Sequence, residues 1–483
     1  MKSDHPILPA SMTAIFYDLE TTDTNPIGQI LNYCFIETDD NFNTVSELVG
    51  EIAISRTQLP RAGAILANRI DVTEHQKQDH PPEHIAMETI ADYLQGIIDK
   101  AQGRIPLIGY NSARFDLPYL RTSFLRNGVN PYFFGKLTPR DLFFVVQKLS
   151  ATCSDFPRPE RANCDEKRLS LKLESITKHL GLLEGKQTHE SRDDVLLTIK
   201  LAQKIEEKFG VDVRTYMAYE VAGIHKKIDK GDIITVLWPN YDVSSAELAV
   251  AVPMALLDAT NFGALWIDLE RYQAGKGRAS LKWFNVSGSL FVKGPSNSQA
   301  ELKEVASKAI KEFGKITLDN FFETSVCDIE QDIYRLHPKM NFSGLEALHA
   351  AIWKGRVEKL SKLKDRVARV LFRRFELVDY KWGSGQDVRI RELLIKYANY
   401  RYGGELLLSK SAPSEDATEE ERAKRYHLTL KELVEEVDTE LKEASPADKK
   451  LLNSLKKYYL ASDIYDLAGE MLEKLPEDVA EGK

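Results

Sequence analysis

The stretch that decides the fold is an apolar run with two acidic residues near the N-terminus, Ala14-Ile15-Phe16-Tyr17-Asp18-Leu19-Glu20-Thr21. Side chains two positions apart on a strand point to the same face, so Asp18 and Glu20 would project from one side of a buried strand. Ionised carboxylates are costly to bury unless a cation compensates them, and Mg²⁺ prefers oxygen ligands of this kind. The pair therefore indicates a metal site, with a solvated strand edge as the alternative in a chain of 73 acidic residues.

A third carboxylate stands where a second buried strand, predicted over residues 105–111, leads into a helical pattern. This residue is Asp116, which is either a cap of that helix or a further metal ligand. The helix is expected over residues 116–127.

A fourth carboxylate and a histidine occur near residue 190. Ser191 followed three residues later by Asp194 resembles a capping box, which predicts a helix over residues 192–208. Asp194 would lie on its first turn, as a metal ligand or only as a charge that favours the helix dipole, with His189 in the preceding loop. Four acids and a histidine in these contexts indicate a catalytic site.

Phosphodiester hydrolysis is a reaction that such a set can perform. Two metal ions roughly 3.5–4 Å apart can stabilise the phosphoryl oxygens and lower the pKa of a water molecule. The four acids are the natural metal cage, with Asp18 as the bridging ligand. His189 is the side chain best placed to take the proton from the attacking water.

The set resembles the DEDDh 3′→5′ exonucleases in Asp18, Glu20, Asp116, His189 and Asp194. The segments 17–21 (Tyr-Asp-Leu-Glu-Thr), 59–66 and 109–116 resemble the N-terminal motifs of the exonuclease I family, the single-strand DNA exonucleases of bacteria. Residues 282–287 and 396–402 are similar more loosely. One departure is Asp193 beside Asp194: the spacing from His189 favours Asp194 as the ligand, and Asp193 stays the alternative.

The secondary-structure signals divide the chain into three parts. Residues 1–208 alternate strands and helices, which predicts an α/β domain with strands near 13–20, 30–38, 50–55 and 105–111 and helices near 83–100, 116–127, 171–180 and 192–208. Residues 209–350 contain short β-like runs (232–238, 264–269, 281–286 and 290–292) and a helix near 298–313. Residues 351–483 are helical and charged, with last helices near 430–444 and 447–475. The resemblance implies a ribonuclease-H-like exonuclease domain, an SH3-like α+β middle domain and a C-terminal helical domain in these ranges.

The resemblance also implies an activity. The chain would be a metal-dependent 3′→5′ exodeoxyribonuclease that degrades single-stranded DNA to 5′-mononucleotides, processively, with a role in DNA repair and recombination. Two Mg²⁺ ions would be its cofactor, for which Mn²⁺ can substitute, and single-strand DNA-binding protein a partner. A 3′→5′ exoribonuclease with the same site, or a non-catalytic single-strand nucleic-acid-binding protein, are the alternatives.

The residues that we consider as substrate contacts could also have purely structural roles. The resemblance implies that Glu20 and Thr21 meet the terminal nucleotide, although a threonine that ends a strand is common. Arg114 matches phosphate geometry, and Phe115 is either a wedge against a base or part of the core. Residues 389–402 interleave cations with aromatic rings, as single-strand binders do, and Tyr397 and Arg401 are our candidates there.

Charge is unevenly distributed over the chain. The net charge is −8, yet residues 354–374 hold nine basic residues against two acidic ones around a helical apolar stripe. This pattern predicts an amphipathic helix whose positive face follows the phosphate backbone, with a solvated helix face as the alternative.

The remaining composition indicates a soluble cytoplasmic protein, which we expect to be a monomer. Four cysteines show no paired spacing, and we find neither the apolar run of a signal peptide nor 18 consecutive apolar residues. His75, His80 and His84 are spaced as in some metal sites, but no cysteine or carboxylate pattern accompanies them. We therefore interpret them as surface histidines.

Overall fold

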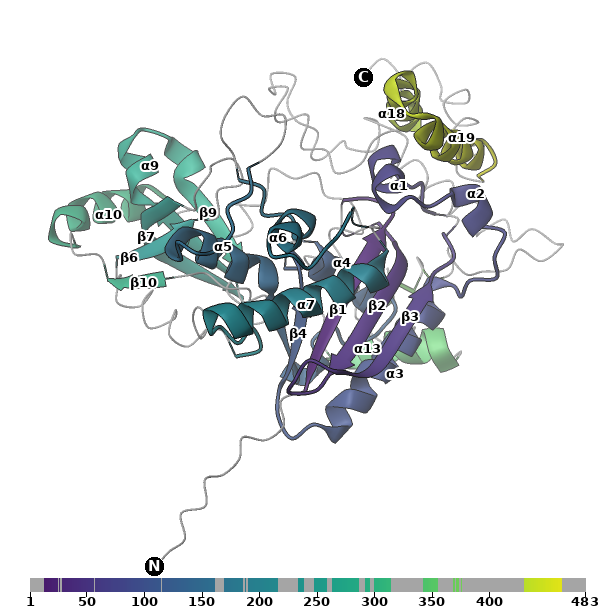
Figure 1. Ribbon diagram of the computed structural model, residues 1–483, viewed down its shortest axis with the longest axis horizontal. Helices are drawn as coiled ribbons and strands as arrows, with labels where there is room; N and C mark the ends of the chain where they lie inside the picture. The colour runs from purple at the N-terminus through teal and green to yellow at the C-terminus, as the bar shows by residue number, and fades with distance from the viewer. Residues whose placement is uncertain are drawn as a thin grey trace, which may run out of the picture.

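A computed structural model gives the tertiary structure (Figure 1). It describes residues 13–24, 26, 28–55, 57–113, 115–160, 169–185, 187, 190–215, 233–238, 247–258, 263–285, 292–295, 299–313, 342–354, 368–369, 371–372, 375 and 430–462. Within these ranges no helix combines the length and the apolar character that crossing a membrane would require.

The first sheet has five strands in the order β3-β2-β1-β4-β5: β1 (Ala14–Thr21), β2 (Ile30–Thr38), β3 (Thr44–Glu51), β4 (Ile105–Gly109) and β5 (Leu137–Asp141). β1, β2 and β3 pair antiparallel, whereas β4 runs parallel to both β1 and β5. β1 therefore lies in the centre of a mixed sheet, which is where a continuous apolar strand is buried on both faces.

Helices cover both faces of this sheet. Phe16, Cys34 and Ile36 pack with α5 (Leu142–Thr152), α6 (Leu173–His179) and α7 (Ser191–Phe209). Ile15, Tyr17 and Phe35 pack on the other face with α3 (Glu83–Lys100) and α4 (Asp116–Arg126). Figure 1 shows α7 lying across β1 and β2. The alternation expected for β1 thus sends its odd and even side chains into two different cores.

Several elements differ from the sequence prediction. The third strand was expected near 50–55 but spans Thr44–Glu51, because its outward face is polar or exposed and carries little apolar signal. β5 and α5 were not predicted, and neither were the short helices α1 (Ala62–Asn68) and α2 (Val72–His75). The predicted helices over 83–100, 116–127 and 192–208 are confirmed to within one residue at each end.

A second five-stranded sheet follows the first along the chain. It is antiparallel, in the order β10-β6-β7-β8-β9: β6 (Ile234–Trp238), β7 (Glu247–Asp258), β8 (Gly263–Asp268), β9 (Leu281–Asn285) and β10 (Val292–Pro295). Leu269 of α9 (Leu269–Gln273) and Phe313 of α10 (Gln299–Phe313) close a separate small core with Ile267. Short β-like runs were predicted here, but the long strand β7 was not.

The C-terminal helices α18 (Leu430–Glu443) and α19 (Pro446–Leu460) pack on the first domain, against α1 and α2. The side chains that they bury in this contact are Leu433, Val437, Leu451, Leu452, Leu455 and Tyr459. The Arg61 guanidinium pairs with Glu436 at 3.0 Å, and the Thr73 amide donates to Oγ of Ser454 at 2.9 Å. A further helix, α13 (Phe342–Lys354), packs against Leu125 of α4. Segments more than 200 residues apart in sequence therefore share a core with the first domain.

Candidate active site

Three of the predicted acids meet where α7 crosses β1. Asp18 and Glu20 lie on the face of β1 that α7 covers, and Asp194 lies on the first turn of α7. One carboxylate oxygen of each lies within 4.8 Å of the others. The alternation of β1 and the start of α7 together produce this convergence, which neither segment could make alone.

Asp116 lies beside this trio but outside the 4.8 Å group. It is the first residue of α4, and its Oδ1 accepts a hydrogen bond from the Leu19 amide at 3.1 Å. The N-cap position of α4 is taken by Phe115, so Asp116 is its first helical residue and not its N-cap. β4 pairs with β1 at Ile15 and Phe16, so Leu19 lies beyond this pairing and its amide is available to Asp116.

The turn after β4 is tight, and a glycine makes it possible. A Cβ added at Gly109 would lie 2.4 Å from Cβ of Ser112 and 3.2 Å from Cε1 of Tyr17. A larger residue here would push the turn away from β1. Gly109 therefore helps to bring Asp116 back toward the strand that carries Asp18 and Glu20.

Burial and mutual repulsion raise the pKa values of these carboxyl groups. Burial, with the charge of Asp194 and then of Asp116, raises the pKa of Glu20 to about 8. Burial also raises the pKa of Asp116 to about 7, although backbone hydrogen bonds lower it. The pKa of Asp18 is raised well above its usual value by burial and by Asp116, Glu20 and Asp194. Such a set holds its charge at neutral pH only when a cation compensates it.

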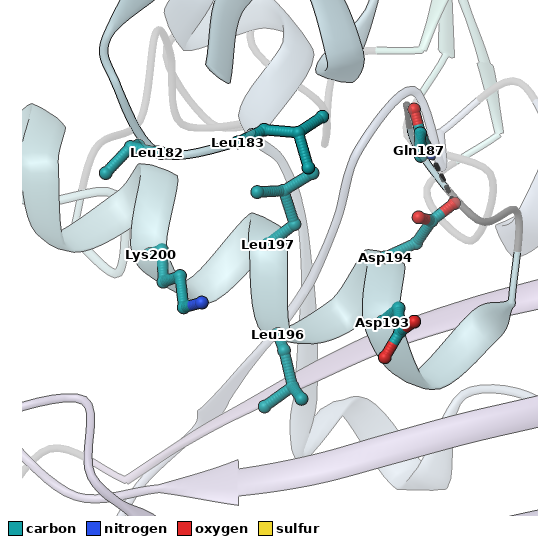
Figure 2. Close-up of a pocket in the computed structure, with 8 residues that line it drawn as sticks. All are labelled: Leu182, Leu183, Gln187, Asp193, Asp194, Leu196, Leu197 and Lys200. Carbon is teal, nitrogen blue, oxygen red and sulfur yellow. Dashed lines mark hydrogen bonds between the residues drawn. The ribbon is translucent and has the colours of Figure 1, made fainter. Parts of the chain in front are cut away.

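The structure separates the two adjacent acids of α7. Asp194 is buried and joins Asp18 and Glu20, whereas Asp193 is exposed. Nε2 of Gln187 donates a hydrogen bond to Oδ2 of Asp194 at 2.5 Å. Both residues line a cavity of about 180 Å³, and Figure 2 shows the contact between them. The rest of the cavity is lined by Asp193, Lys200 and leucines 182, 183, 196 and 197.

The predicted capping box of α7 is wrong. α7 begins at Ser191, whose side chain is buried, and Glu190 takes the N-cap position without a side-chain cap hydrogen bond. The Ser-x-x-Asp spacing therefore does not cap this helix. It nevertheless placed Asp194 correctly on the first turn.

Asp141 is a buried acid near the site that sequence reasoning missed. Its Oδ1 accepts from the amides of Asn111 and Phe143, and its Oδ2 accepts from the amide of Ala113. It thus fixes the loop that leads to Asp116, and its charge contributes to the raised pKa of Asp116. The signal that could have found it is an aspartate directly before the apolar helix pattern of residues 142–149.

The remaining candidates are only partly described. Thr21 is buried, donates through Oγ1 to the Asp23 carbonyl at 2.7 Å, and accepts from Nδ2 of Asn68 through its own carbonyl at 2.8 Å. Phe115 is partly buried, with its ring 5.3 Å from that of Tyr119. Outside the described residues lie His189, Arg114, Tyr397, Arg401 and most of the basic segment 354–374.

The interpretation of three histidines as surface residues is wrong for His75. His75 is 6% exposed, and burial lowers its pKa. His80 is largely covered, and its Nε2 lies 3.0 Å from Glu51. His84 packs between the rings of Trp353 and Phe375, at 5.4 and 5.3 Å.

Comparison with known structures shows which fold this is. The chain matches the Escherichia coli exonuclease I solved in complex with a dT13 oligonucleotide with a TM-score of 0.69 at 17% identity, over 94% of this chain and 100% of that one. An exonuclease I from Methylocaldum szegediense matches with a TM-score of 0.66 at 15% identity, over the same shares. The chain therefore has the fold of these solved exonuclease I structures.

Sequence comparison also finds similar curated proteins, which share one name. Exodeoxyribonuclease I of Haemophilus influenzae is 27% identical over 200 residues, and that of Escherichia coli is 26% identical over 201 residues. The match covers about 40% of this chain and 40% of each relative. No family model matches the chain. The resemblance to the exonuclease I family that the sequence motifs indicated is thus confirmed.

Proposed function

We propose that this protein is a metal-dependent 3′→5′ exonuclease that degrades single-stranded DNA to 5′-mononucleotides. The observation that carries the proposal is the convergence of Asp18, Glu20 and Asp194 within 4.8 Å, with Asp116 beside them. The exodeoxyribonuclease I relatives and the solved complex of the Escherichia coli enzyme with an oligonucleotide support the same conclusion.

The donor set fits hard divalent cations. All four side chains offer carboxylate oxygens, which Mg²⁺ and Mn²⁺ prefer. The raised pKa values of Asp18, Glu20 and Asp116 indicate that positive charge is needed there. Asp18, Glu20, Asp116 and Asp194 would hold two Mg²⁺ ions, for which Mn²⁺ can substitute. When bound, such ions stabilise negative charge on the phosphoryl oxygens and lower the pKa of a water molecule.

The side chains of this protein would then divide the remaining work. His189, two residues beyond Gln187, would take the proton of the attacking water as general base. Glu20 and Thr21 would hold the terminal nucleotide, Arg114 a phosphate, and Phe115 a base or only the core. Tyr397 and Arg401 would contact the strand further away.

We extend the proposal to the rest of the chain. Residues 1–208 form the exonuclease domain, 209–350 an SH3-like middle domain and 351–483 a C-terminal helical domain. The antiparallel sheet β6–β10 and the packing of α18 and α19 on α1 and α2 support this division. The last two domains would confine single-stranded DNA and make degradation processive. Single-strand DNA-binding protein would be a partner, and the protein would act in DNA repair as a cytoplasmic monomer.

Paired DNA and RNA oligomers of one sequence test this proposal. Each carries a 5′ label and is incubated with the full chain and Mg²⁺, then with EDTA. We expect the DNA oligomer to be shortened from its 3′ end with release of 5′-mononucleotides, and no products in EDTA. Shortening of RNA alone would indicate an exoribonuclease instead, because a 2′-hydroxyl contact can distinguish the two sugars. Binding without any product would leave a non-catalytic nucleic-acid-binding protein.

A further inference from the structure

A second group of side chains that could hold a metal ion lies outside the acidic site. Glu51 ends β3, His75 ends α2, and His80 lies in the segment between α2 and α3 (Figure 1). One ligand atom from each lies within 4.8 Å of the others. Glu51 pairs in register with Asn32, which pairs with Glu20, so two strand spacings of roughly 5 Å each separate the backbones of the two groups.

A backbone carbonyl decides which nitrogen of His75 carries a proton. Nε2 lies 2.9 Å from the carbonyl oxygen of Ile52, which can only accept a hydrogen bond, so Nε2 must be protonated. In the neutral ring Nδ1 then carries the lone pair, and it lies 3.2 Å from Oε2 of Glu51. A ligating histidine commonly donates its other N–H to a carbonyl in this way, which orients the ring for the metal.

His80 approaches the same carboxylate oxygen. Its Nε2 lies 3.0 Å from Oε2 of Glu51, and it is buried, yet within the described part of the chain it has no partner in hydrogen-bond geometry. The rings of His75 and His80 lie 4.4 Å apart at 32°. If both rings were protonated to pair with Glu51, their positive charges would repel each other at this separation. Two neutral rings and the carboxylate can instead share one bound cation.

The separations fit tetrahedral coordination. Ligand atoms about 2.0–2.1 Å from a tetrahedral Zn²⁺ lie roughly 3.3–3.4 Å from each other. The two nitrogen-to-oxygen distances here are 3.2 and 3.0 Å. Two imidazoles and one carboxylate favour Zn²⁺ over Mg²⁺, which binds oxygen ligands. This chemistry therefore differs from that of the acidic site.

We propose that Glu51, His75 and His80 bind a divalent cation of the zinc class, with water in the fourth position on the exposed side of Glu51. The ion joins the end of β3 to α2 and to the segment that leads into α3. α2 in turn contacts α19 through Thr73 and Ser454. The site therefore stabilises the corner of the first domain on which the C-terminal helices pack.

Zinc competition against a chromophoric chelator tests this proposal on the full chain. Excess Mg²⁺ and the Asp194→Asn background reduce zinc binding at the acidic site. We expect one tightly bound zinc in this background and at least an about 100-fold weaker affinity in His80→Ala and in Glu51→Gln. His179→Ala is the matched control, because His179 is an exposed histidine on α6, and it should keep full affinity.

A second measurement separates loss of the site from loss of the fold. Glu51 is half exposed, so Glu51→Gln should keep the metal-free Tm while losing the rise in Tm that zinc produces in the parent. Bound Co²⁺ should show the intense visible absorption of four-coordinate geometry in the parent and not in the variants. The proposal is overturned if the Asp194→Asn protein binds no zinc, or if Glu51→Gln and His80→Ala bind it as tightly as the parent does.

Discussion

The backbone amide of Leu19 donates a hydrogen bond to Oδ1 of Asp116, 3.1 Å away, across 97 residues of sequence. Leu19 stands between the two carboxylates of β1, so this contact fixes the first turn of α4 beside both of them. A hydrogen bond to a carboxylate lowers its pKa, but burial outweighs it here and the pKa of Asp116 is about 7. The contact therefore positions Asp116 more than it stabilises its charge.

Asp194 and Asp193 provide a matched pair of variants. Asp194→Asn removes a carboxylate from the buried group, and we expect activity with Mg²⁺ to fall by at least about 100-fold, because metal ions supply several kcal/mol of charge stabilisation. Asp193→Asn changes an exposed neighbour and should remain within about 3-fold of the parent. Rates on a labelled single-stranded oligomer measure both, and equal losses would contradict the assignment.

His189 should affect turnover without affecting metal binding. We expect His189→Ala to lower kcat by at least about 100-fold, since a general base contributes this much. Mn²⁺ binding, followed by electron paramagnetic resonance, should change little because imidazole is not part of the carboxylate group. Near-normal kcat would remove His189 from the mechanism.

The metal-free protein should lose stability as the pH rises. The pKa of Glu20 is raised to about 8 in the folded state, so between pH 4.5 and 8 the folded state binds more protons than the unfolded state. Stability from this group is complete below about pH 4.5 and is lost as the pH rises through 8.

Thermal denaturation in EDTA at pH 5.5 and pH 8.5 measures this effect. We expect the free energy of unfolding to fall by a few kcal/mol, about the size that linkage gives for shifts of several pH units. Glu20→Gln should reduce the pH dependence, and excess Mg²⁺ should reverse it. An EDTA-treated protein that is more stable at the higher pH would refute the raised pKa.

Asp141 should matter for stability through the loop that it holds. In the native protein, Oδ2 of Asp141 accepts a hydrogen bond from the Ala113 amide at 3.0 Å. In Asp141→Asn an NH2 group would face this amide, so a buried donor would lose its partner. We expect a loss of about 1–3 kcal/mol in the free energy of unfolding, measured in urea. The control Asp155→Asn alters an exposed acid and should stay within about 0.5 kcal/mol.

The packing of α19 on the first domain can be tested with two leucines of one helix. Leu455 is fully buried against α1 and α2, so Leu455→Ala should cost about 2–5 kcal/mol and expose the C-terminal helices to proteolysis. Leu460 is 53% exposed, and Leu460→Ala should change the free energy of unfolding by less than about 0.5 kcal/mol. Similar cleavage rates for the two variants would show that this contact does not hold α19 in place.

Local patterns in the sequence were enough to predict much of the first domain. The alternation of residues 14–21 predicted that Asp18 and Glu20 share a face, and helical periodicity predicted α3, α4 and α7. Periodicity predicted poorly where few side chains are fully buried or the element is short. The strand β3 was misplaced for this reason, and α1 and α2 were missed.

The contacts between distant residues were decided only by the tertiary structure. By itself the sequence determined which residues carry carboxylates and which faces of strands and helices they occupy, because side-chain direction follows from backbone periodicity. Folding decided that Asp194 meets Asp18 and Glu20, that Asp141 holds the loop before Asp116, and that Glu51 meets His75 and His80. Such meetings depend on sheet order and on the packing of helices over it, and no local pattern encodes the distance between residues that far apart.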